Sequence, residues 1–75
     1  MNYHEYIDSD PAYLLGKPLI KGTRITVELI LQKLSEGATS EQLLEAYPTL
    51  TDQSILASLA YASDIVSNEM IIAVA

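Results

Sequence analysis

The amino-acid sequence predicts a mainly α-helical domain: a tri-helical helix-turn-helix fold, homeodomain-like or winged-helix-like, with a short N-terminal β-hairpin region. The spacing of apolar residues changes from about two to about 3.6 at Thr26, which is typical of a change from strands to helices. Three apolar-periodic stretches follow, each preceded by a threonine that can cap a helix. We therefore expect one domain over residues 1–75, with a strand and turn region at 1–25, a three-helix cluster at 26–68 and an apolar tail at 69–75.

The first 25 residues carry strand and turn signals. Tyr3–Ile7 alternates large and polar side chains, which predicts a strand, and Asp8–Pro11 has the composition of a turn. Leu19–Ile20 and Arg24–Ile25 flank a short segment that contains Gly22. Because glycine readily adopts a positive φ angle, we expect a tight hairpin around Gly22.

The first two helices have clear start and stop signals. The first begins after Thr26 as N-cap and ends at Gly37, and its buried stripe comprises Val27, Ile30, Leu31 and Leu34. In the second, Thr39 and Gln42 have the spacing of a capping box, and Pro48 prevents continuation.

The third helix is predicted from Thr51, its N-cap, to about Ser67. Its expected buried stripe consists of Ile55, Leu59, Ala62 and Val66, widened by Leu56. Its expected outward face consists of Gln53, Ser54, Ala57, Tyr61 and Asp64. The four-residue link Tyr47–Leu50 gives the second and third helices the spacing of a helix-turn-helix unit.

A helix-turn-helix unit suggests a DNA-binding surface. Small side chains on the third helix would let its backbone approach base edges, and cations on the hairpin could contact phosphate. The expected DNA-binding residues are Lys21, Arg24, Gln53, Ser54 and Ser58. Against this, the third helix has no lysine or arginine and begins with Asp52. Arg24 has a second interpretation, an internal ion pair with Glu28 or Glu45.

The amino-acid composition limits which other functions the protein can have. The 75 residues include no cysteine and one histidine, His4, so we expect no metal site, no cofactor and no catalysis. The longest apolar run, Met70–Ala75, is far shorter than the ~20 residues that span a bilayer. No secretory signal opens the chain, so the expected location is the cytoplasm.

A short chain that is 49% hydrophobic often completes its core by pairing with another chain. We expect a homodimer. The expected interface residues are Leu29, Tyr61, Met70, Ile71 and Ile72. The net charge of −6 suits a basic protein partner better than nucleic acid.

Two segments resemble a known family. Gly16–Val27 reads GKPLIKGTRITV, which resembles the signature of the bacterial domain-of-unknown-function family 433. Glu36–Gly37 and Leu43–Thr51 resemble the continuation of that signature, and the likeness covers about residues 5–63. The resemblance implies a compact helix-turn-helix or winged-helix-like domain, often encoded beside a small PIN-like ribonuclease and therefore antitoxin-like.

The chain departs from the family pattern at Ser40, where proline is frequent, and in the tail beyond Asn68. Taken together, the sequence favours a non-enzymatic, antitoxin-like regulator that binds operator DNA and neutralises a cognate PIN-like ribonuclease toxin. The alternative is a protein–protein interaction module with no nucleic-acid binding, which dimerises through Leu29 and the tail. A third possibility, an enzyme, would need an ordered cleft around His4 with convergent carboxylates.

Overall fold

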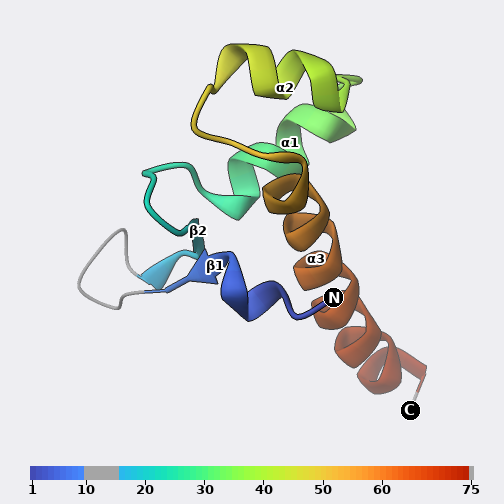
Figure 1. Ribbon diagram of the computed structural model, residues 1–75. Coiled ribbons are helices and arrows are strands. Elements are labelled where there is room, and N and C mark those ends of the chain that lie inside the picture. Colours follow the sequence, from blue (N-terminus) through green and yellow to red (C-terminus); the bar gives the residue numbers. More distant parts are fainter. Residues whose placement is uncertain (10–15, 75) are drawn as a thin grey trace.

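Three helices and a two-stranded antiparallel sheet make up the chain in the computed structural model (Figure 1). The structure describes the backbone of residues 1–9 and 16–74 and the side chains of residues 1–9 and 16–68. The mainly helical fold predicted from the sequence is confirmed. The elements in chain order are η1 Tyr3–Glu5, β1 Ile7–Asp8, β2 Leu19–Ile20, α1 Val27–Ser35, α2 Ser40–Ala46 and α3 Asp52–Val74.

The N-terminal segment begins with a 3₁₀ turn, so the predicted strand over Tyr3–Ile7 is wrong for all but its last residue. The Asn2 side chain caps η1 by accepting a hydrogen bond from the His4 N–H. In a 3₁₀ turn, residues i and i+3 lie on the same side. This conformation therefore lets both Tyr3 and Tyr6 pack against the core, which an alternating strand would not do.

Strand β1 pairs with β2, in the register Ile7 to Ile20 and Asp8 to Leu19. Of the turn predicted at residues 8–11, Asp10 and Pro11 lie outside the described residues.

Of the tight hairpin predicted around Gly22, the turn is present, but Arg24–Ile25 is not a strand, and β2 pairs with β1 instead. The Thr23 N–H donates to the Ile20 carbonyl at 3.0 Å, and Gly22 has φ 77°. A positive φ at the third position of a β-turn identifies it as type II. After the turn the chain returns beside β2, with an antiparallel bridge between Leu19 and Thr26. The turn therefore leads directly into the first helix.

Helices α1 and α2 have the predicted ends. Thr26 caps α1 by accepting the Leu29 N–H. At the other end, Gly37 has φ 99° and donates to the Leu34 carbonyl, while the Ala38 N–H donates to the Lys33 carbonyl. These two bonds form a Schellman motif.

At the start of α2, the capping box between Thr39 and Gln42 is complete in both directions.

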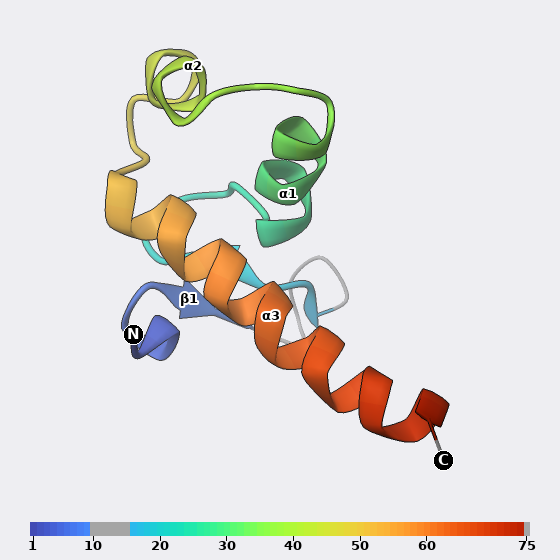
Figure 2. The same ribbon diagram turned by 90° about the vertical axis from the view of Figure 1, so that its right-hand side faces the viewer.

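Helix α3 begins where predicted but continues to Val74 instead of ending near Ser67. Thr51 is its N-cap, since Thr51 Oγ1 accepts the Ser54 N–H. The sequence between residues 67 and 74 contains neither glycine nor proline, so nothing local stops the helix. Figures 1 and 2 agree that the C-terminal half of α3 extends beyond the other elements.

The core lies where α1 and the β1–β2 pair meet the N-terminal half of α3, with α2 closing one end. Its buried apolar members are Ile7, Ile20, Val27, Ile30, Leu43, Leu50, Ile55 and Ala57. The sequence has no phenylalanine or tryptophan, and these buried residues are all aliphatic, with Tyr3, Tyr6, Tyr47 and Tyr61 packed against them.

Candidate functional site

Helix α3 packs on the core mainly through small side chains, so its predicted orientation is wrong in part, although Ile55 is buried and Gln53 and Asp64 are exposed as predicted. Ser54 is 4% exposed, and Ala57 and Ser58 are fully buried. Leu56 and Leu59, which the sequence placed inside, are exposed instead. Small side chains let a helix backbone come close to its neighbours, and the adjacent helix and strands already supply the bulky aliphatic groups.

An exposed apolar stripe consequently runs along the outer side of α3. Leu56, Leu59 and Val66 are 54%, 45% and 50% exposed, and Ser63 lies exposed between them. These four residues, which we call the α3 seam, are spaced i, i+3, i+7 and i+10 and so share one helix face. None carries a charge. Exposed apolar side chains that follow one another on a surface mark an interaction site more often than isolated ones do.

Two of the expected DNA-binding residues cannot reach a ligand, so their assignment is wrong. Ser54 and Ser58 belong to the buried side of α3, where Ser58 Oγ donates to the Ser54 carbonyl at 3.0 Å. The Ser54 hydroxyl is 3.0 Å from Thr51 Oγ1. Both hydroxyls are thus satisfied inside the helix, as buried polar groups require.

The other three expected DNA-binding residues are exposed. Lys21 and Arg24 flank the turn at Gly22, and Gln53 lies in the first turn of α3.

The ion pair expected of Arg24 is absent from residues 1–9 and 16–68. Glu45 is exposed, and Glu28 pairs instead with Lys17, at 3.2 Å between Nζ and Oε1. Both partners of that pair are largely exposed to solvent, so it stabilises the fold little.

Of the expected interface residues, Leu29 is partly buried and Tyr61 does not lie on the outer face. The Tyr61 ring packs edge-to-face on Tyr3, with 5.5 Å between ring centroids and an interplanar angle of 84°. That contact forms part of the core edge. Met70, Ile71 and Ile72 lie on the helical backbone of α3, but their side chains are outside the described residues.

The N-terminal turn is fastened to α3 by a hydrogen bond. Tyr3 Oη donates to Asp64 Oδ2 at 2.6 Å. This bond, together with partial desolvation and the nearby carboxylate charge, raises the pKa of the Tyr3 phenol. The Asp64 carboxylate can only accept a hydrogen bond. The contact therefore lasts only while the Tyr3 phenol keeps its proton.

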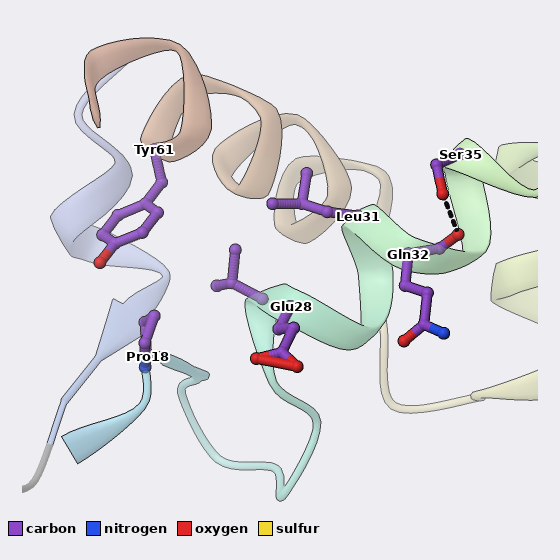
Figure 3. A pocket seen from close by; sticks show the side chains of 7 residues that line it. Pro18, Glu28, Leu31, Gln32, Ser35 and Tyr61 are labelled. Carbon is purple, nitrogen blue, oxygen red and sulfur yellow. Dashed lines mark hydrogen bonds between the residues drawn. The ribbon is translucent and has the colours of Figure 1, made fainter. Parts of the chain in front are cut away.

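A second surface feature is an open groove of about 660 Å³ between α1 and α3 (Figure 3). Its lining consists of Pro18, Val27, Glu28, Leu31, Gln32, Ser35 and Tyr61. The polar groups on its rim are engaged locally, since Ser35 Oγ donates to the Gln32 carbonyl and the Gln32 amide is 3.4 Å from Glu36. The lining residues do not form the paired acid and base that proton-transfer catalysis would need.

Fold and surface together define a small three-helix domain with a helix-turn-helix connection and an uncovered apolar helix face. The chain belongs to the family of proteins of unknown function DUF433, whose family model matches residues 7–62. It is 34% identical over 58 residues to the uncharacterized protein y4eO of Sinorhizobium fredii (strain NBRC 101917 / NGR234). That match covers 77% of this chain and 26% of the relative, so the chain spans about a quarter of the relative's length.

No solved structure matches the chain. None of the helices in the described part of the chain combines the length and apolarity needed to cross a membrane.

Proposed function

We propose that this chain is a protein–protein interaction module that docks a partner protein on the α3 seam. The observation that carries the proposal is the exposure of Leu56, Leu59 and Val66 along one helix face that has no charge between Leu56 and Val66. A helix face of this kind normally packs against another apolar surface, because leaving it in water forfeits the free energy of burial.

The chemistry of the seam favours protein over nucleic acid. Duplex binding draws most of its affinity from lysine and arginine at phosphates, whereas the seam has no cation and the chain has a net charge of −6. Asp52 at the start of α3 adds a negative charge where a recognition helix would enter the groove of DNA.

The charged residues outside the seam indicate which kind of partner protein could bind there. Exposed carboxylates at the end of α1 and on α2, such as Glu36, Glu41 and Glu45, suit a basic partner surface. A ribonuclease needs such a surface to hold RNA. The toxin expected from the family resemblance therefore remains the partner class that we favour for the acidic side of the molecule.

Site-specific photo-crosslinking tests this function. A photoreactive residue at Leu59 in the cells that produce the protein should give covalent adducts with protein, while one at Glu41, exposed on α2, should not give the same adducts. Absence of any protein adduct at both Leu56 and Leu59 would contradict the proposal.

A DNA-binding regulator is the second candidate, favoured by one observation. Lys21 and Arg24 are exposed on either side of the Gly22 turn, and Gln53 is exposed at the start of the second helix of the helix-turn-helix pair. Lys21 and Arg24 could contact phosphates while Gln53 reads an adenine edge.

A fluorescence titration of a mixed-sequence duplex at two salt concentrations separates the two functions. A regulator should bind with an affinity that falls with salt, and Lys21→Ala with Arg24→Ala should weaken binding and flatten that dependence, by up to about 0.9 in slope per lost contact. The interaction module should show no such binding.

A further inference from the structure

We infer that the occupant of the α3 seam is the α3 seam of a second copy of this chain, so that the protein is a homodimer built on a helix–helix contact. The inference rests on the proposed function, since it names the protein that the seam docks.

The spacing of the seam is that of a helix pair. Leu56, Leu59, Ser63 and Val66 alternate steps of three and four residues, which is the a and d pattern by which two helices pack along a shared line. The described backbone of α3 stays helical to Val74, so the line is long enough for several turns of contact.

The residues beside the seam permit close approach. Ala60 and Ser67 occupy the flanking positions on one side, and both are small and uncharged. Small flanking side chains allow two helix backbones to come near each other. Each copy carries a net charge of −6, and the four seam residues bring no carboxylate against its equivalent; Asp52, four residues before Leu56, places one charge at the N-terminal end of the same face.

The exposed area summed over the whole chain is larger than that of a compact monomer of its mass. The chain exposes 5245 Å², whereas a compact monomer of 8.2 kDa is expected to expose about 4,500 Å². The surplus of roughly 700 Å² is close to the ~800 Å² that each partner contributes to an interface of standard size.

The overall extension of the chain agrees with this surplus. The radius of gyration is 12.9 Å, against about 11 Å expected for 75 residues. Figure 2 shows where the extra extent lies, since the C-terminal end of α3 runs past the β1–β2 pair.

Light scattering coupled to size-exclusion chromatography tests the inference on the full chain. We expect twice the chain mass for the unmodified protein. Leu59→Asp should raise the dissociation constant by about 100-fold or more, because it would bury an unpaired charge in the contact. Ile65→Asp is the matched control: Ile65 is 40% exposed on the same helix but points away from the seam, so this variant should remain a dimer.

Helix content of each variant, measured by circular dichroism, shows whether a loss of mass reflects unfolding. A monomeric unmodified protein, a dimeric folded Leu59→Asp variant, or equal loss of dimer in both variants would each overturn the inference. The photo-crosslinking at Leu59 then decides the proposed function separately. Adducts with a protein of another mass would support the proposed function even if the homodimer inference fails. A lack of adducts would contradict the proposed function.

Discussion

Two buried serines illustrate the limit of sequence interpretation at the scale of single residues. Ser54 and Ser58 are small and polar, and such residues suit both a surface that approaches DNA and a helix that packs closely on a core. Only the position of α3 against α1 and β1 separates these cases. The sequence interpretation placed both serines outside, and the structure buries both.

Substitution of Ser58 should reveal how tightly α3 is packed. Ser58→Leu inserts a large side chain at a position with no exposed surface, so the free energy of unfolding should fall by about 1–3 kcal/mol. Asn68→Leu, at an exposed position of the same helix away from the seam, should change it by less than about 0.5 kcal/mol. Denaturant unfolding measures both. Equal effects would mean that the two sites do not differ in packing.

The Tyr3–Asp64 contact makes stability depend on alkaline pH. The pKa of the Tyr3 phenol is raised above its ordinary value of 10.0 by the hydrogen bond to Asp64. A group whose pKa is raised on folding adds stability below its unfolded pKa, near 10, and loses it as the pH rises through the folded pKa. Unfolding midpoints of the unmodified protein should therefore fall across this alkaline range.

Tyr3→Phe removes the titrating phenol and should show a smaller alkaline decline than the unmodified protein. Asp64→Asn keeps an acceptor without the carboxylate charge and should bring the pKa of Tyr3 closer to its ordinary value, as followed by ultraviolet absorbance of the phenolate. An identical decline in the unmodified protein and in Tyr3→Phe would show that the contact is not responsible.

At the scale of elements, the sequence predicted best what short-range bonding decides. The caps at Thr26, Thr39 and Thr51, the helix stop at Gly37 and the turn at Gly22 depend on groups within a few residues of one another. All of them are present. The conformation at Tyr3–Glu5 depends on distant packing against the core, so its alternating pattern misled the prediction of a strand.

Substitutions of Gly37 test how far the end of α1 depends on the local backbone conformation. Its φ of 99° is strained for residues with a Cβ atom, although a Cβ atom added at this position would meet no heavy atom of another residue within 4 Å. Gly37→Ala should therefore destabilise the protein by about 1–2 kcal/mol through backbone strain alone. Gly37→Asn should cost less, since asparagine tolerates this conformation better. Thermal unfolding compares them, and equal costs would contradict a conformational origin.

At the scale of the whole molecule, the sequence shows which residues of α3 are apolar but not which side of the helix faces the core. Helix α3 has two faces that could be buried, one small and one bulky, and single-sequence reasoning assigned the bulky one to the core. The core instead accepts Ala57 and Ser58 because Ile30 and Val27 already fill it. Leu56, Leu59 and Val66 were therefore recognised as apolar but placed on the wrong side, whereas Ile55 is buried as predicted.

The charge of the whole molecule predicts how salt acts on self-association. Two copies with a net charge of −6 repel each other, and added salt screens that repulsion. The dimer dissociation constant should stay level or fall as salt rises, as measured by sedimentation equilibrium. A dissociation constant that rises with salt would indicate an interface held by opposite charges, which the seam lacks.

Thiol accessibility offers the most direct measurement of whether protein covers the seam, because the chain has no cysteine of its own. Leu59→Cys should react with a thiol reagent more slowly as protein concentration rises, while Ile65→Cys should react quickly at every concentration. Equal and concentration-independent rates at the two positions would show that the seam stays open to water and would contradict the account.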